Sequence, residues 1–256
     1  MAEFDRPTVA ARPGTAVGID EGLRSYMLKV YNYMGLGLVV TGVVAFAMAQ
    51  LATTTVAANA VAELPNGILL TQLGLTIYGS PLMGVIALAP LAFILVLSFG
   101  INKLSVGTTQ ILFWAFAAVM GLSLSSIFLQ YTGQSIAKVF FISAAMFGAM
   151  SLYGYTTKRD LTAMGSFLFM GLIGLIIASV VNLFWSPSWL GFLISIVGVG
   201  IFLGLTAWDT QKIKESYNVG FGADVLAKGA IMGALSLYLD FINIFLFLLR
   251  LLGNRN

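Results

Sequence analysis

Residues 234–250 read ALSLYLDFINIFLFLLR, an apolar run that is interrupted near its middle by one acid, Asp240. The run belongs to a nearly uncharged stretch, 228–250, which as a helix rising about 1.5 Å per residue is long enough to cross a membrane. An ionised carboxylate at the centre of such a helix costs about 2.5 to 3.5 kcal/mol, so it must face protein or water rather than lipid. The stretch therefore predicts a membrane helix, with Asp240 as its candidate functional residue.

The polar and small residues of this helix share one side. Gly229, Gly233, Ser236, Asp240 and Asn243 recur at steps of four, three, four and three residues, which is helical spacing. The large apolar residues between them suit lipid or other helices. We expect an inward polar seam in which Asp240 is either a protonated, hydrogen-bonded structural group or part of a proton or cation path.

The rest of the chain predicts six more spans of the same kind. Hydrophobic residues make up 59% of the sequence and charged residues 9%, against roughly 25% charged in soluble domains, so a water-soluble domain is excluded. The further apolar runs lie at about 32–52, 81–101, 109–129, 138–156, 163–185 and 190–209. Small residues spaced for close helix contact occur as the pairs Gly200 and Gly204, Gly229 and Gly233, and Gly121 and Ser125. The expected fold class is an all-α membrane protein with seven transmembrane helices.

Two segments fall outside the runs. Residues 1–30 carry most of the charge of the N-terminal region and two prolines, and we interpret them as a polar, partly disordered cytoplasmic tail before a membrane domain at 31–256. Residues 53–80 are mildly apolar but are broken by Pro65, Asn66, glycines and threonines. We expect this segment to form an external loop or to lie on the surface, with an eighth span as the less favoured alternative.

The distribution of Lys and Arg predicts the orientation. With seven spans, ten of the thirteen basic residues fall on the side of the N-terminus and three, Lys138, Arg250 and Arg255, on the other. Because short cytoplasmic loops are enriched in Lys and Arg, the N-terminus is expected inside and the C-terminus outside. The net charge of +3 is too dispersed to indicate nucleic-acid binding.

The sequence contains no cysteine and no histidine. This excludes disulfides, thiolate metal sites, catalytic Ser-His-Asp triads and the usual histidine pH switch. Any response to pH near neutrality must therefore come from carboxyl groups in unusual surroundings.

The second candidate acid is Asp209, within GLTAWDTQKIK at 204–214 near the inner end of the sixth run. It could form an interfacial ion pair with Lys212 three residues on. Alternatively, if the sixth and seventh helices pack together, Asp209 could meet Asp240. Two like charges cannot both ionise in a dry site, so such a pair would share a proton and form a latch that opens as pH rises.

Four segments together resemble the Bax-inhibitor family, also called transmembrane Bax-inhibitor-motif proteins. They are SFGINKLS at 98–105, YGYTTKRDL at 153–161, WDTQKIK at 208–214 and LSLYLDFINIFLFLLRLLG at 235–253. The resemblance covers roughly residues 25–253 and is most specific in the last helix. It implies a multi-pass protein of the bacterial inner membrane, with six helices wrapped around a central seventh.

The resemblance also implies a function, that of a calcium leak channel gated by hydrogen-bonded aspartates, which match Asp209 and Asp240. The nearest match to a gate-associated cation of such relatives is Lys103, which lacks the bidentate fork of arginine. Calcium would be the transported ion, held weakly and transiently by Asp209 and Asp240 with Ser236 and Asn243 in support, and no cofactor is expected. The same oxygen groups would also serve protons or sodium.

The sequence leaves other classes of function to be compared with a channel. The main alternative is a modulator that binds another membrane protein, such as a membrane-bound quality-control protease, through the tail 1–30. A proton-coupled exchanger would show saturating flux, but no inverted repeat is visible. An intramembrane aspartyl protease would need a Tyr-Asp and a Gly-x-Gly-Asp motif, where this chain has Trp208-Asp209 and Leu239-Asp240. A retinal-type receptor would need a lysine at mid-helix, whereas Lys228 lies at a helix end. We therefore expect that the protein is not an enzyme.

Overall fold

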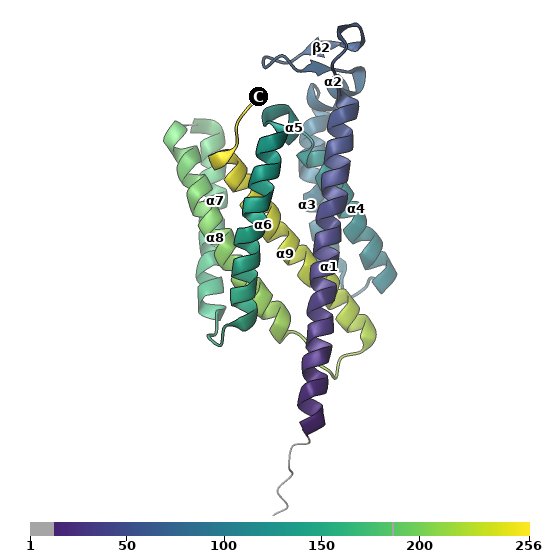
Figure 1. Ribbon diagram of the computed structural model, residues 1–256, viewed down its shortest axis with the longest axis vertical. Coiled ribbons are helices and arrows are strands. Elements are labelled where there is room, and N and C mark those ends of the chain that lie inside the picture. The colour runs from purple at the N-terminus through teal and green to yellow at the C-terminus, as the bar shows by residue number, and fades with distance from the viewer. Residues whose placement is uncertain (1–12, 186) are drawn as a thin grey trace, which may run out of the picture.

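The computed structural model describes the backbone of residues 13–185 and 187–256, and in this part of the chain seven helices are long and apolar enough to cross a membrane. Figure 1 shows them as a bundle, with the start of α1 and the C-terminus at opposite ends. The seven are α1 (Pro13–Ala52), α3 (Leu82–Gly100), α4 (Val106–Leu124), α6 (Gly133–Thr156), α7 (Thr162–Trp185), α8 (Ser188–Glu215) and α9 (Ala223–Leu252). The seven-span prediction is confirmed by length and composition. The short helix α5 (Ile127–Gln130) follows α4.

The first helix begins much earlier than the apolar run predicts. Residues 13–30 are helical and continue without a break into the span, so the expectation of a disordered tail is wrong for them. Tyr26, Met27 and Val30 are buried against the bundle. Residues 1–12, the remainder of the predicted tail, lie outside the described residues. Arg24 and Lys29 interrupt the apolar pattern but do not end the helix. Hydropathy therefore predicts where the uncharged stretch begins, and not where the helix begins.

Residues 53–80 form a small cap at one end of the bundle and contain no helix long enough to span a membrane. The cap consists of β1 (Thr53–Thr54), the 3-10 helix η1 (Ala57–Asn59), β2 (Ala62–Glu63), β3 (Leu69–Leu70) and α2 (Gln72–Tyr78). The strand β3 lies between β1 and β2 and is antiparallel to both. Asn66 donates from Nδ2 to the carbonyl oxygen of Leu129 at 2.8 Å, which ties the cap to α5. The interpretation as an external or surface-lying segment fits this geometry.

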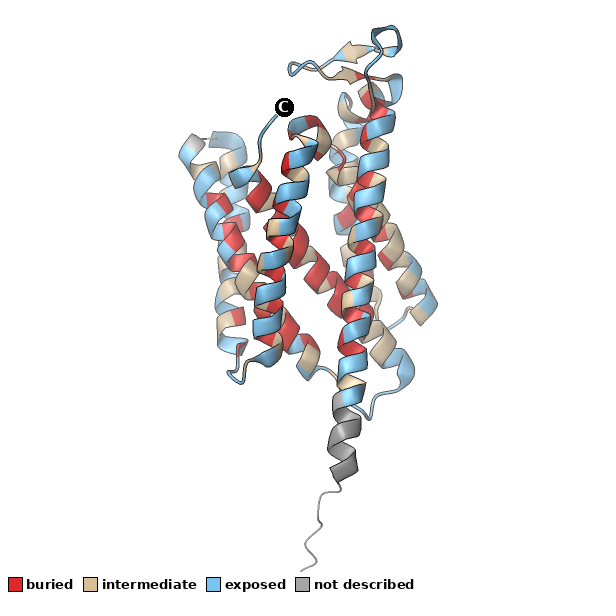
Figure 2. Ribbon diagram, in the orientation of Figure 1, coloured by how far each residue is buried: buried red, intermediate tan, exposed pale blue. Residues whose placement is uncertain are grey.

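The last helix is the most buried element of the bundle. In its apolar window 67% of the residues are buried, compared with 11% for α3 and 6% for α7. Figure 2 shows buried positions along the length of α9, which crosses the bundle obliquely. Its principal neighbours are α8, α1, α6 and α4, whereas α3 packs mainly on α4 and α7 on α8. The helix α9 is thus the most buried of the seven, and α3 and α7 are the most exposed.

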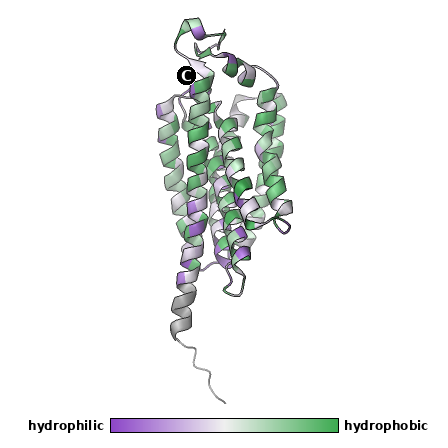
Figure 3. Ribbon diagram, turned by 90° about the vertical axis from the view of Figure 1, so that its right-hand side faces the viewer, coloured by the Kyte–Doolittle hydropathy of each residue, from purple (hydrophilic) through white to green (hydrophobic). Residues whose placement is uncertain are grey.

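The outer surface of the bundle is apolar. Large hydrophobic side chains stay exposed on the helices, with Phe99, Phe184 and Trp185 all more than four-fifths exposed. Figure 3 shows that hydrophobic residues cover the helices over most of their length, while hydrophilic residues gather toward the end near the N-terminus. In water such a surface would cause aggregation. In contact with lipid tails it is the surface expected of a membrane domain.

Glycines set the closest helix contacts. A Cβ atom on Gly154 of α6 would overlap the backbone carbonyl of Ala207 on α8, and one on Gly121 of α4 would lie 2.6 Å from the carbonyl oxygen of Thr41 on α1. Among the predicted small-residue positions, Gly204 and Gly233 also face neighbouring side chains closely, whereas Gly200 has no atom within 4 Å of such a Cβ. Small residues therefore permit the helices to approach where the sequence predicted it, with Gly200 as the exception.

Candidate functional site

Asp209 of α8 and Asp240 of α9 meet at the interface between these two helices, which pack along each other more extensively than any other helix pair in the described chain. The two carboxyl groups are close enough to interact directly through their side chains. Asp240 is only 4% exposed, and Asp209 is half-buried. The structure thus brings together the two acids that the sequence could not place within reach of each other.

A hydrogen bond between two carboxyl groups requires a proton on one of them, because an ionised carboxylate can only accept. Oδ2 of Asp240 is buried and has no hydrogen-bond partner in the described structure. A single shared proton supplies the missing donor and removes the repulsion between two like charges. The geometry therefore fits a proton-sharing pair.

No cation among the described residues forms an ion pair with either carboxyl group. Lys212 influences Asp209 electrostatically, but its Nζ atom lies over the Trp208 ring, 4.8 Å from the ring centroid. The part of the chain that the structure describes contains no ion pair within 4 Å, so the predicted contact between Asp209 and Lys212 is not formed. The carboxyl pair is consequently the main electrostatic feature of this interface.

Lys103 lies away from the pair. It is exposed in the turn between α3 and α4, at the end of the bundle where Lys228 donates from Nζ to the carbonyl oxygen of Ile101 at 3.2 Å. Asp240 follows Lys228 by twelve residues on α9, roughly 18 Å at helical rise. The structure therefore brings Lys103 to neither acid, and its expected place at the gate does not follow from this geometry.

The supporting residues of the polar seam contribute less than the spacing suggested. Ser236 and Asn243 are half-buried, and Asn243 donates from Nδ2 to the carbonyl oxygen of Leu239 in its own helix at 2.8 Å. The described residues contain no group of three or more acids that could hold a metal ion. Two carboxyl groups alone do not make a tight calcium site, which usually takes six to eight oxygen ligands.

Sequence reasoning missed two buried hydroxyl contacts near the pair. The Tyr238 hydroxyl and Thr41 Oγ1 are 2.7 Å apart, and Thr41 donates to the carbonyl oxygen of Ala117 at 2.8 Å, which links α9, α1 and α4. Ser151 Oγ lies 2.6 Å from the Tyr31 hydroxyl and 3.0 Å from Thr210 Oγ1, which links α6, α1 and α8. The sequence shows hydroxyl residues inside apolar runs, but this pattern does not identify their hydrogen-bond partners.

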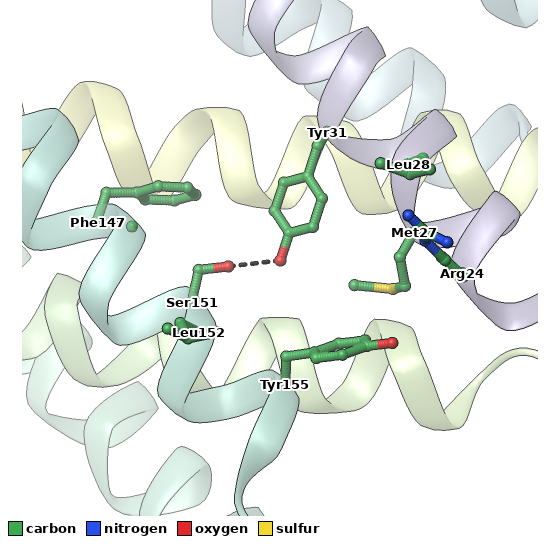
Figure 4. Close-up of a pocket in the computed structure, with 9 residues that line it drawn as sticks. Arg24, Met27, Leu28, Tyr31, Phe147, Ser151, Leu152 and Tyr155 are labelled. Atoms are coloured by element: carbon green, nitrogen blue, oxygen red, sulfur yellow. Dashed lines mark hydrogen bonds between the residues drawn. The ribbon is translucent and has the colours of Figure 1, made fainter. Parts of the chain in front are cut away.

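An open groove of about 510 Å³ lies between α1 and α6 on the side of the N-terminus. Figure 4 shows the hydrogen bond between Tyr31 and Ser151 spanning it, with the aromatic rings of Phe147 and Tyr155 on either side and Arg24 at its edge. Through Ser151 this groove connects to Thr210, the neighbour of Asp209 in sequence. Neither aspartate lines the groove itself.

These observations define a class: a helical membrane protein with seven candidate spans, whose most buried helix carries an acid that faces an acid of the preceding span. The family model described as "Inhibitor of apoptosis-promoting Bax1" matches residues 23–256. The chain therefore belongs to the Bax inhibitor family, as the four segments quoted from the sequence indicated.

Several bacterial relatives match nearly the whole chain. It is 52% identical over 236 residues to the uncharacterised protein RP147 of Rickettsia prowazekii, covering 92% of each chain. It is 48% identical over 239 residues to the inner membrane protein YbhL of Escherichia coli, covering 91% of this chain and 93% of YbhL. An uncharacterised protein of Caulobacter vibrioides is 43% identical over 256 residues. With its seven apolar helices, the chain is a multi-pass protein of the bacterial inner membrane.

Proposed function

We propose that this protein is a pH-sensitive cation leak channel, with calcium as the transported ion, and that Asp209 and Asp240 form its gate. The single observation that carries the proposal is the contact of these two carboxyl groups across the α8–α9 interface, with no cation paired to either in the described chain. An acid inside a membrane span is a functional residue by default, and two acids in contact form a group whose charge depends on pH.

The gate works through the shared proton. When the pair holds one proton, the hydrogen bond joins α8 to α9 and closes the path. Loss of this proton at higher pH leaves two negative charges, which at a separation of about 4 Å repel by about 4 kcal/mol at an effective dielectric constant of 20. This repulsion favours separation of the helices, so the proposal requires flux to rise with pH.

The same change creates the attraction for a cation. Two free carboxylates suit a hard cation such as calcium, and the absence of a third acid in the described surroundings keeps binding weak. Weak binding is what conduction needs, since an ion must leave as readily as it enters. In this account the N-terminus lies inside and the C-terminus outside, with six helices arranged around α9.

Reconstitution tests whether the protein conducts at all. Purified protein in liposomes should admit calcium faster than protein-free liposomes at the upper end of a series from about pH 6 to about pH 8, where the pair loses its proton. Calcium entry equal to that of protein-free liposomes throughout the series would contradict a channel.

One feature favours a second function, that of a modulator that binds another membrane protein. The N-terminal part of α1 extends beyond the other helices, as Figure 1 shows. Deletion of residues 1–20 tests this function, because a deletion through residue 30 would also remove the buried Tyr26, Met27 and Val30. Loss of partner capture with unchanged calcium flux would assign binding to this segment.

A further inference from the structure

We propose that the end of the bundle that carries the C-terminus has a binding site for a phosphate group, in a cavity between α7, α8, α9 and the chain that joins α5 to α6. Two arginines, Arg250 and Arg255, line this cavity of about 450 Å³ together with Gln130, Tyr131, Asn182 and Ser195. We call it the arginine cavity. It lies about ten residues beyond Asp240 along α9, roughly 15 Å, so the inference does not rest on the proposed function.

The C-terminal segment is held in place so that Arg255 reaches the cavity. Residues 254–256 pair with 130–132: Thr132 donates from its backbone N to Asn254 at 3.1 Å, and Asn256 donates to Gln130 at 3.0 Å. The backbone N of Asn254 also donates to Ser135 Oγ at 2.9 Å. These bonds fix a segment that would otherwise fray at the end of a helix. These hydrogen bonds therefore fix the backbone position of Arg255.

The two guanidinium groups have no acidic partner. Neither forms an ion pair within the described part of the chain, and Arg250 instead lies over the Phe247 ring, 6.0 Å from its centroid. Among the described side chains, Glu63 is the one acid at this end, and it does not line the cavity. The two positive charges that line the cavity repel each other. A bound anion would be attracted to both and would offset this repulsion.

The chemistry of the lining identifies the anion as a phosphate group. Arginine presents a planar fork that matches two oxygens of a phosphate, and two such forks bind it with charge-assisted hydrogen bonds. The amide side chains of Gln130 and Asn182 add polar surface to the same cavity. Since Arg250 belongs to the last turn of a membrane span, the phosphate could come from a lipid headgroup or from free phosphate, which offer the same oxygens.

The number of basic residues at this end strengthens the inference. Of the three Lys and Arg residues expected on this side of the membrane, two line the arginine cavity. The third, Lys138, is exposed on α6 and is absent from the lining. Basic residues are sparse on the outer side of membrane proteins, so two in one cavity need a local reason. Lys138 also provides a control for the loss of one positive charge.

The test compares Arg250→Gln and Arg255→Gln with Lys138→Gln in the purified full-length protein. One arm measures retention of phosphatidylglycerol against phosphatidylcholine by native mass spectrometry. The other measures the Tm in inorganic phosphate against chloride at equal ionic strength. The wild type and Lys138→Gln should behave alike, and either arginine variant should bind about tenfold more weakly. If a glutamine variant does not fold, Arg255→Lys keeps the charge but loses the planar fork and gives the same comparison.

The two arms distinguish the sources of the phosphate. An arginine-dependent rise of Tm in inorganic phosphate supports a site for the free anion, and arginine-dependent retention of phosphatidylglycerol alone supports a lipid headgroup. The proposal is overturned if neither signal depends on the arginines, or if Lys138→Gln reduces both as much as the arginine variants do.

Discussion

Asp240 is buried in the most buried helix of the bundle, and the side chain of Asp209 faces it from α8. A pair that shares one proton carries one negative charge where two ionised groups would carry two, which lowers the cost of burying both carboxyl groups. The energetic balance at this position therefore depends on a single proton.

The shared proton can be observed directly. Infrared difference spectra between low and high pH should show the carbonyl band of a protonated, buried carboxyl group, which disappears as pH rises. The band should be lost in Asp209→Asn and in Asp240→Asn, because either change removes the carboxyl pair. It should persist in Asp224→Asn, a matched control on the same helix whose side chain is exposed. A band that survives in both pair variants would exclude proton sharing at this site.

The Tyr238 hydroxyl gives a second prediction for a single residue. Tyr238 is fully buried, and its hydroxyl is 2.7 Å from Thr41 Oγ1. Tyr238→Phe should lower the free energy of unfolding by about 0.5 to 1.5 kcal/mol, the usual net contribution of one hydrogen bond. Tyr153→Phe, at an exposed tyrosine of α6, should leave stability unchanged. Equal thermal stability of the two variants in detergent would show that the Tyr238 contact contributes nothing.

Contact between α6 and α8 depends on the missing side chain of Gly154. Because a Cβ atom there would overlap the carbonyl of Ala207, Gly154→Ala should force the helices apart and cost about 1 to 3 kcal/mol. Gly148→Ala on the same helix meets nothing within 4 Å and should be neutral or slightly stabilising. Thermal unfolding of both variants checks this, and an unchanged Tm for Gly154→Ala would contradict the close α6–α8 packing.

The sequence predicts the features that depend on local properties of the chain, and it does not predict those that depend on how separate helices pack. Uncharged runs located all seven spans, and the helical spacing around Asp240 correctly predicted that this residue faces inward, because apolar length and periodicity are local properties. The start of α1 at Pro13 was missed, since Arg24 and Lys29 interrupt hydropathy without interrupting the helix. The contact of Asp209 with Asp240 depends on how α8 and α9 align after the turn between them, which no local pattern encodes. The roles expected of Lys103 and Asn243 depend on the same arrangement and stay predictions.

At the scale of the whole molecule, the distribution of charge predicts which end of the bundle faces the cytoplasm. The chain has no cysteine, so single-cysteine variants report topology without background. Asn59→Cys, in the exposed 3-10 helix of the cap, should react with a membrane-impermeant maleimide in spheroplasts. Asn102→Cys, in the exposed turn after α3, should react only after permeabilisation. Labelling of Asn102→Cys in intact spheroplasts would reverse the orientation.

The central claim is that the aspartate pair controls cation flux through the bundle, and calcium entry into liposomes tests it most directly when the pair is altered. Flux through the wild type and through Asp224→Asn should rise from about pH 6 to about pH 8 as the shared proton is lost. Asp209→Asn and Asp240→Asn should show flux that no longer changes over this range. A normal pH response in both pair variants would contradict the gate.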